Sequence, residues 1–244
     1  MTDFPPIPRA TRQSPISLLP EFITPVESDY LRFDWPASVI AHPHTPPAGA
    51  AHRGTRFSIL AGPQTSGGIT LAGHRYLLRE LHFHAPSEHF ADAPGTGAQT
   101  GEQQFAGEIH LVHRSPVDAR IAVVSVFLDA VASDSAVPRE DSDGAIRAFL
   151  AEAVSQIKGK VSETPVEFSP RGLLPRSPVF FRYQGSLTTE PFAENVSWIV
   201  MAEPIACDDP DLKTLGARVD DDDARPIQDR DRRIIVRCVP RDPH

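Results

Sequence analysis

Three histidines occupy positions from which they can bind one metal ion. His82 and His84 end the apolar segment 76–84, and His110 lies in the apolar segment 107–113. Both segments are bounded by turn residues and are predicted to be β-strands. Alternate residues of a strand share a face and lie about 6.5–7 Å apart, and a neighbouring strand lies about 4.8 Å away. His110 can therefore join His82 and His84 on one ion where the two strands are neighbours.

This set of ligands favours a particular metal chemistry. Three protein ligands and an open fourth position are typical of a catalytic zinc ion, whereas structural zinc sites are closed. A His-x-His pair on a strand is, taken alone, more often ordinary surface or core histidine. The spacing from His82 and His84 to Glu88 also resembles the metal motif of cupins, which use two histidines, a glutamate and a later histidine. Spacing alone thus indicates a metal site without naming the fold.

The elements that must position these histidines are mainly strands. Strand candidates lie at 56–60, 76–84, 106–113, 120–128, 179–183, 195–201 and 232–239. One helix is predicted over residues 146–157, where apolar side chains recur at helical spacing, and this stripe is interpreted as core packing. Residues 42–53, rich in Pro, Gly, Ala and His, are predicted to form a loop. The run Asp220–Asp223 is interpreted as a solvated loop rather than a calcium site.

Length and composition restrict the class of protein. The chain has 244 residues, of which 40% are hydrophobic and 23% charged, as in a soluble globular protein, and one all-β domain can reach this size. Its 25 prolines favour loops and edge strands over a helical bundle. The net charge of −8, with no basic patch, argues against a nucleic-acid partner. We predict a Pro-rich N-terminal arm at residues 1–11 and one domain over residues 12–240.

The sequence predicts neither a membrane span nor a secretory signal. No apolar run approaches the ~18–20 residues of a span, and the N-terminus lacks an apolar h-region. The chain as written is expected to be cytoplasmic, with the mature form of a secreted or periplasmic protein as the alternative. Cys207 and Cys238 have neither the pattern of a disulfide framework nor zinc spacing, so a disulfide and two free buried thiols both stay open.

Eight short words of the sequence carry a resemblance to a known family. They are RQSPISL (12–18), ELHFHAPSEHF (80–90), GEIHLVH (107–113), IAVVSVFL (121–128), FSPRGLLP (168–175), YQGSLTTEPF (183–192), NVSWIV (195–200) and ARPIQ (224–228). In these words and their order the chain resembles the alpha-class carbonic anhydrases, whereas the cupin pattern explains none of the later words. The resemblance implies a mainly β fold with a few peripheral helices, a single domain built on a large, mostly antiparallel twisted sheet.

The resemblance also implies a metal centre. His82, His84 and His110 match the three ligands of a Zn²⁺ ion in this family. Glu108 matches the carboxylate that is bonded to the third ligand, and it shares the face of His110 by the alternation of a strand. Zinc is therefore the expected cofactor.

Further matches imply how the substrate is held and attacked. Thr188 matches the hydroxyl that orients a zinc-bound hydroxide, and Glu88 matches the carboxylate that receives the threonine's proton. The threonine needs such an acceptor because it uses its lone pair on the hydroxide. Thr189 matches a second threonine of the pocket, with bicarbonate as its expected contact. The apolar wall that holds carbon dioxide is matched by Val112, Val123, Leu187 and Trp198.

Two positions depart from the family pattern. The neutral amide that supports the first ligand is Glu80 here, and its charge is expected to make His82 a more electron-rich ligand and a zinc-bound water less acidic. The position of the proton-shuttle histidine is occupied by Thr55. We take His52 as the candidate shuttle, and His42 and His44 are the alternatives.

The function that the resemblance implies is zinc-dependent, reversible hydration of carbon dioxide to bicarbonate and a proton, the reaction of a carbonic anhydrase. Its partner would be this small-molecule substrate, and the sequence leaves the oligomeric state open. The alternative is a carbonic anhydrase-related, zinc-binding protein with little catalysis that acts as a binding module. Such proteins typically lose at least one ligand histidine, whereas all three are present here.

Overall fold

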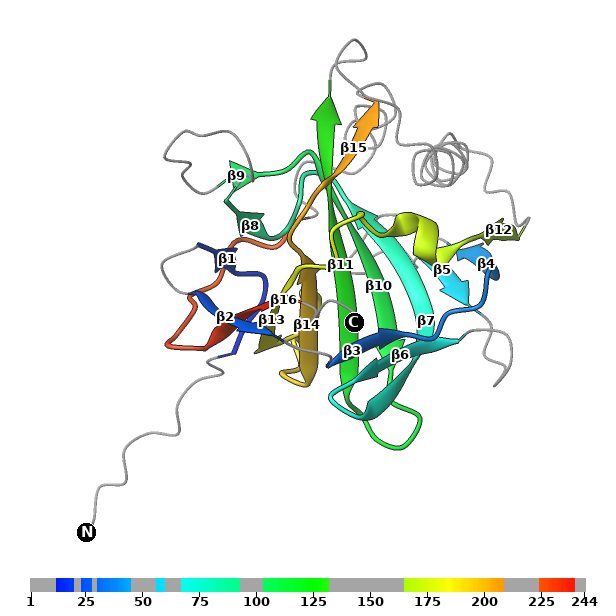
Figure 1. The fold of residues 1–244 in the computed structure, drawn as a ribbon, viewed down its shortest axis with the longest axis horizontal. Coiled ribbons are helices and arrows are strands. Elements are labelled where there is room, and N and C mark those ends of the chain that lie inside the picture. Colours follow the sequence, from blue (N-terminus) through cyan, green and yellow to red (C-terminus); the bar gives the residue numbers. More distant parts are fainter. Residues whose placement is uncertain are drawn as a thin grey trace.

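Strands dominate the molecule, as the ribbon of this computed structural model shows (Figure 1). The structure describes residues 12–19, 23–27, 30–44, 56–59, 67–92, 103–131, 165–208 and 224–239. Within these ranges there is a single helical element, the short 3-10 helix η2 at Pro170–Leu173. None of the helical structure in the described ranges is long and apolar enough to cross a membrane.

The described strands are short at the two ends of the chain and long in its middle. They are β1 (Ser17–Leu18), β2 (Ile23–Glu27), β3 (Leu31–Phe33), β4 (Val39–His44), β5 (Arg56–Ile59), β6 (Gly68–Leu71), β7 (His74–His84), β8 (Phe90–Ala91), β9 (Gln103–Gln104), β10 (Gly107–Arg114), β11 (Ile121–Val131), β12 (Val166–Phe168), β13 (Phe180–Gly185), β14 (Val196–Met201), β15 (Ile205–Asp208) and β16 (Ile235–Val239).

Most of these strands form one large twisted sheet in the order β12-β4-β5-β7-β10-β11-β14-β13-β16-β2, with β6 beside β7, β3 beside β6, and β15 beside β11. The pairs β11–β14, β11–β15 and β16–β2 are parallel. The other described pairs of this sheet are antiparallel. A smaller sheet has the order β1-β8-β9. The predicted large, mostly antiparallel sheet is confirmed.

A tight hairpin sets the register of the first part of β7, the strand that carries His82 and His84. The hairpin joins β6 to β7 through Ala72 and Gly73, whose φ angles are +50° and +77°. Positive φ at both central residues is the geometry of a type I′ turn, which matches the twist of paired strands. Leu71 consequently pairs with His74. The register changes once along β7, because its pairing with β10 shifts between Leu78 and Glu80. Leu78 and Leu81 consequently lie in the same apolar cluster, and His82 takes the opposite face of the sheet.

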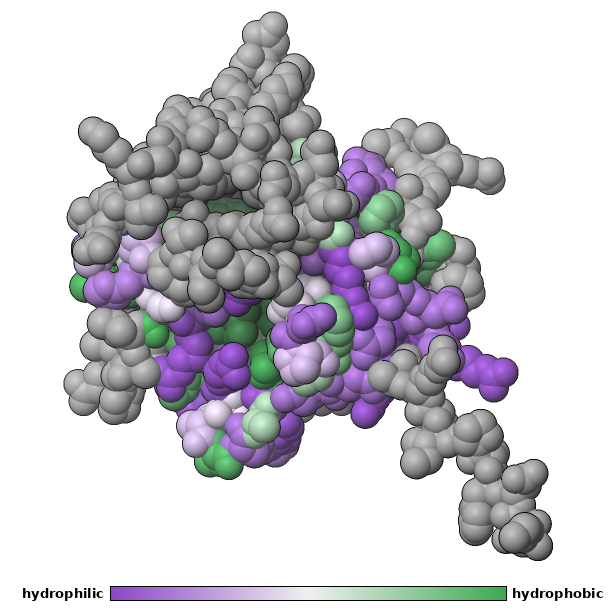
Figure 2. All heavy atoms as spheres, turned by 180° about the vertical axis from the view of Figure 1, so that it is seen from behind, coloured by the Kyte–Doolittle hydropathy of each residue, from purple (hydrophilic) through white to green (hydrophobic). Residues whose placement is uncertain are grey.

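The central strands are buried on both faces. Leu111 and Val124 belong to one apolar cluster, whereas Val112 and Val123 belong to a second cluster on the opposite face. Side chains of neighbouring residues point to opposite faces, so these strands read as continuous apolar runs rather than as an alternating pattern. Seen from behind, the described surface is largely hydrophilic, with apolar residues in a recess (Figure 2). The functional residues described below lie on the face of the second cluster.

All seven predicted strands are present, with ends displaced by at most three residues. The predicted helix at 146–157, the arm at 1–11 and the acidic run Asp220–Asp223 lie outside the described residues. Cys207 and Cys238 are both buried, and neither forms a disulfide with another described residue. Cys207 lies on β15 and Cys238 on β16, and these two strands are not neighbours in the sheet. Of the two alternatives for the cysteines, the structure thus shows buried thiols and no disulfide between them.

The predicted loop at 42–53 is wrong for its first three residues. His42, Pro43 and His44 continue strand β4 and pair with β5. A proline disfavours a strand because it has no N–H to donate. Strand β12, however, pairs only with residues 39–41. Among the described residues the pairing with β12 therefore ends before Pro43, and prolines within sheets are found mainly where a strand lies at an edge.

Candidate metal centre

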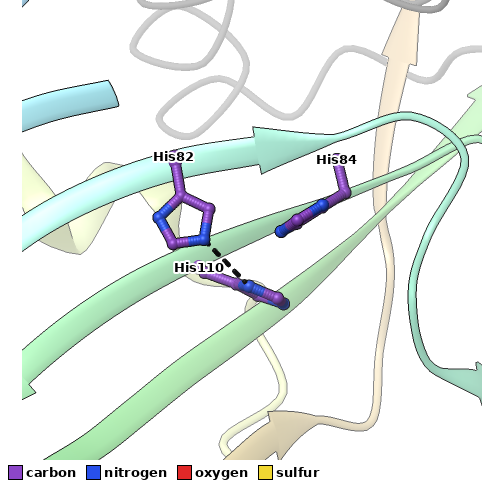
Figure 3. Close-up of side chains that lie close together, drawn as sticks. All are labelled: His82, His84 and His110. Carbon is purple, nitrogen blue, oxygen red and sulfur yellow. Dashed lines mark hydrogen bonds between the residues drawn. The ribbon is translucent and has the colours of Figure 1, made fainter. Parts of the chain in front are cut away.

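The register of two strands brings the three histidines together. His82 and His84 project from one face of β7, and β7 pairs with β10 so that His110 lies directly opposite His82. All three are buried, with 8%, 2% and 1% of their surfaces exposed in chain order. Their rings converge (Figure 3), with centroid separations of 5.2, 5.2 and 4.6 Å. The juxtaposition that the strand pattern made possible is therefore present.

Ring nitrogens of His82 and His110 face each other. His82 Nε2 and His110 Nδ1 are 3.3 Å apart, the contact dashed in Figure 3. On the far side of each ring lies a carboxylate: Glu80 Oε1 is 3.0 Å from His82 Nδ1, and Glu108 Oε1 is 2.9 Å from His110 Nε2. A carboxylate only accepts hydrogen bonds, so each neutral ring places its single proton there. The facing nitrogens then both present lone pairs.

Two facing lone pairs repel each other, and a cation between them removes the conflict. In a tetrahedral site with Zn–N bonds of about 2.0–2.1 Å, two ligand nitrogens lie about 3.3–3.4 Å apart. The observed separation of 3.3 Å agrees with this value. One nitrogen from each of His82, His84 and His110 lies within 4.8 Å of the others. Three neutral imidazoles are also the donor set of a known class of catalytic zinc. These residues fit zinc.

Glu108 accepts several hydrogen bonds in the protein interior. Its Oε2 accepts from the backbone N–H groups of Glu88 and His89, both at 2.8 Å. Its Oε1 accepts from the rings of His89 and His110, at 2.7 and 2.9 Å, and from the hydroxyl of Ser125. Burial by itself would raise the pKa of Glu108, but the two imidazoles and their hydrogen bonds hold that pKa well below its usual range. Glu108 is thus a fixed carboxylate that orients His110.

A second series of buried hydrogen bonds supports Glu108 through His89. His89 Nε2 lies 2.6 Å from the hydroxyl of Tyr183, which lies 3.0 Å from Ser14 Oγ. Burial raises the pKa of Tyr183 well above its ordinary value, so the phenol keeps its proton. Ser14 Oγ also accepts a hydrogen bond of 3.1 Å from the backbone N–H of Ser186. The segment around Ser14 is thereby connected to the hydrogen bonds that support the candidate metal centre.

Glu88 lies behind the histidines, with 1% of its surface exposed. Its Oε2 is 3.5 Å from His84 Nε2 and 4.0 Å from His110 Nδ1. Its Oε1 accepts a hydrogen bond of 3.1 Å from the backbone N–H of Arg225. The structure places Thr188 in the wall of the cleft, and the hydrogen bond from its hydroxyl to Glu88 stays a prediction.

A cleft of about 310 Å³ opens in front of His82 and His110. Its wall contains the six residues predicted to bind or orient substrate, Val112, Val123, Leu187, Thr188, Thr189 and Trp198. Sheet register explains the apolar part of the wall, because Val112 lies opposite Val123 and Val123 opposite Trp198. Three strands thus contribute one row of apolar side chains next to the row that holds the histidines.

Comparison with known proteins agrees with this centre. The sequence model of the eukaryotic-type carbonic anhydrases matches residues 2–238. The chain belongs to this family.

Individual relatives agree. A carbonic anhydrase of Klebsiella pneumoniae is 28% identical over 227 residues, 92% of this chain and 79% of that protein. Alpha carbonic anhydrase 8 of Arabidopsis thaliana is 33% identical over 183 residues, 71% of this chain and 41% of that protein. Among solved structures, the alpha-carbonic anhydrase of Photobacterium profundum has a TM-score of 0.69 at 27% identity, over 93% of this chain and 89% of that one. The carbonic anhydrase resemblance drawn from the short words is confirmed.

The identity of a proton shuttle stays a prediction. His52 and Thr55 lie outside the described residues, as does the side chain of His44. His42 lies on β4 opposite Ser58 and is not among the residues that line the cleft. In the described part of the lining, the histidines are His82 and His110.

Sequence reasoning missed several charged residues that the carbonic anhydrase fold brings to the cleft. Arg56, Arg114 and Glu190 line it together with Glu80. Arg114 could have been predicted from the sequence, because the alternation of side chains along a strand places it on the same face of β10 as His110. Arg56 could not have been predicted in this way, because it is brought opposite His82 only by the pairing of β5 with β7.

Proposed function

We propose that this protein catalyses the zinc-dependent, reversible hydration of carbon dioxide to bicarbonate and a proton. The observation that carries the proposal is the pair of facing nitrogens, His82 Nε2 and His110 Nδ1, at the base of a cleft with an apolar wall. Each ring is backed by a carboxylate. Membership of the carbonic anhydrase family supports the same reaction.

His82, His84 and His110 would hold the zinc ion. When bound, zinc lowers the pKa of a water molecule from 15.7 to about 7 and thereby supplies a nucleophile near neutral pH. Glu80 and Glu108 keep the rings of His82 and His110 in the tautomers that leave Nε2 and Nδ1 for the metal. The cleft in front of His82 and His110 would give substrate access to the ion.

The apolar wall binds carbon dioxide and excludes water. Val112, Val123 and Trp198 are buried, with 8%, 2% and 2% of their surfaces exposed, and Leu187 packs against the same cluster. Carbon dioxide carries no charge, so it loses little hydration on entering such a site. Bicarbonate is an anion, and an apolar wall without a compensating partner disfavours it. The wall therefore retains the substrate and favours release of the product.

Thr188 and Glu88 orient the nucleophile. The backbone N–H of Arg225 donates to Glu88 Oε1, so this oxygen acts as an acceptor. The hydroxyl of Thr188 donates to Glu88 and turns its lone pair to the hydrogen of the nucleophile. Thr189 contacts bicarbonate before it leaves. Each cycle also releases a proton, for which His52 is the candidate carrier.

Elemental analysis of protein purified without added metal, together with a pH-drop assay of carbon dioxide hydration, tests the proposal. We expect one zinc ion per chain and loss of both zinc and activity in His110→Ala. The matched control is His74→Ala, which removes an exposed histidine from β7 and should change neither. Zinc well below one per chain, with His110→Ala no worse than the wild type, would contradict the proposal.

A further inference from the structure

One oxygen atom of Glu80 contacts both the guanidinium of Arg56 and the ring of His82, a candidate metal ligand. Arg56 Nη1 lies 3.0 Å from Glu80 Oε1, and the same oxygen lies 3.0 Å from His82 Nδ1. The side chains of Arg56 and Glu80 are each 22% exposed, and both line the cleft. The three residues therefore form a short chain from the cleft surface to the candidate metal site.

Sheet register produces this chain. Arg56 on β5 lies opposite His82 on β7, and Ser58 lies opposite Glu80. Arg56 thus reaches Glu80 as a diagonal neighbour, a distance that long side chains span between paired strands. Phe57 fixes the strand, because it lies opposite Leu81 and is fully buried on the other face.

The arrangement restricts where the proton of His82 can lie. A guanidinium carries only donors, so Arg56 uses Glu80 Oε1 as an acceptor. The contact between this oxygen and His82 then requires the ring to donate from Nδ1, which leaves a lone pair on Nε2. A carboxylate in an open cleft has water as a competing partner, whereas Glu108 is fixed by interior donors on both of its oxygens. In the described residues, Arg56 is the second anchor of Glu80, after His82.

We propose that Arg56 is a positioning residue that holds Glu80 against His82 and so fixes the Nδ1–H tautomer of this ligand. The ion pair also compensates the negative charge that the sequence places beside His82. The inference deepens the proposed function and rests on it, because the tautomer matters only where His82 binds zinc.

The first experiment follows the His82 Nδ1 proton by NMR in the protein as purified. We expect this proton to exchange with water at least about tenfold faster in Arg56→Gln than in the wild type, because Glu80 has lost its second anchor. Arg56→Lys keeps a cationic donor and should restore slow exchange. Arg75→Gln, which removes an exposed arginine from β7, is the matched control and should behave as the wild type.

The second experiment measures zinc release to a chelator. We expect Arg56→Gln to weaken zinc binding about tenfold, the lower end for loss of a group behind a ligand. In a Glu80→Gln background Arg56→Gln should have no further effect, because Arg56 acts through Glu80. Unchanged proton exchange and zinc affinity in Arg56→Gln, or additive losses in the double variant, would overturn the inference. A wild type without zinc would instead refute the proposed function, and proton exchange would still decide the role of Arg56.

Discussion

The backbone N–H of Arg225 donates a hydrogen bond of 3.1 Å to Oε1 of Glu88. Arg225 is itself held in place, because its guanidinium lies 3.9 Å from the centroid of the Phe192 ring and donates to the backbone carbonyl of Ser14 at 2.7 Å. A backbone N–H is never an acceptor, so Oε1 of Glu88 must be the acceptor of this bond. This property is what the proposed role of Thr188 requires.

Thr188 and Glu88 should therefore act as one unit. Thr188→Ala is expected to lower kcat/KM about 100-fold or more, the scale of one well-placed catalytic hydrogen bond. Adding Glu88→Gln to that variant should cost little further, because the carboxylate works through the threonine. Thr188→Ser keeps the hydroxyl and is the matched control. Additive losses of hydration rate in this double-mutant cycle would refute the proposed coupling between Thr188 and Glu88.

The residues found from sequence are those whose positions follow from local pattern. His82 and His84 share a face by strand alternation alone, and the apolar runs around them predict the long central strands. The contacts that depend on register between distant segments were not predictable, and the pairing of Arg56 with Glu80 is an example. Very short strands such as β1 and β9 were also missed, because two residues carry no periodicity. The residues of the apolar wall were predicted only from the family resemblance, because they come from three different strands.

Glu108→Gln is expected to damage both the metal centre and the fold. An amide replaces one acceptor oxygen by an NH₂ group, which then faces donors instead of accepting from them. Zinc affinity should fall about 10- to 100-fold, as for other groups that orient a metal ligand, and each buried donor left without a partner costs about 1–3 kcal/mol of stability. Chelator competition and chemical denaturation measure the two effects. Glu167→Gln, an exposed carboxylate on β12, should change neither, and a normal zinc affinity in Glu108→Gln would contradict the assignment.

His113 should make the stability of the protein depend on pH. It is fully buried beside Trp35, whose Nε1 donates to His113 Nε2 at 3.1 Å. Burial lowers the pKa of His113 from 6.5 to about 3. Between these values the unfolded chain binds a proton at this site and the folded protein does not. Its contribution to stability is therefore present above pH 6.5 and is lost as the pH falls, by up to about 1.4 kcal/mol per pH unit.

Denaturant unfolding at several pH values between the two pKa values of His113 tests this linkage. His113→Gln keeps an acceptor for Trp35 but has no group that titrates. We expect its free energy of unfolding to fall less steeply with decreasing pH, by about 1.4 kcal/mol per pH unit. His74→Ala, which removes an exposed histidine, is the matched control and should keep the steep dependence. Equal slopes in His113→Gln and the wild type would show that His113 is protonated in the folded protein.

Proton export, not attack on carbon dioxide, is expected to limit turnover in weak buffer. Every hydration releases a proton, and histidine alone has an unperturbed pKa, ~6.5, suited to carrying it near neutrality. Arg56 and Arg114 line the described cleft, but a guanidinium does not release its proton in this range. Thr55 is the residue predicted to match the shuttle position of the family, and its hydroxyl does not ionise in this range, while His52 lies three positions earlier in the chain. Thus kcat should rise with the concentration of an imidazole buffer while kcat/KM stays constant, and Thr55→His should raise kcat at low buffer. A kcat that is independent of buffer and collapses in His52→Ala would show instead that His52 already carries the proton efficiently.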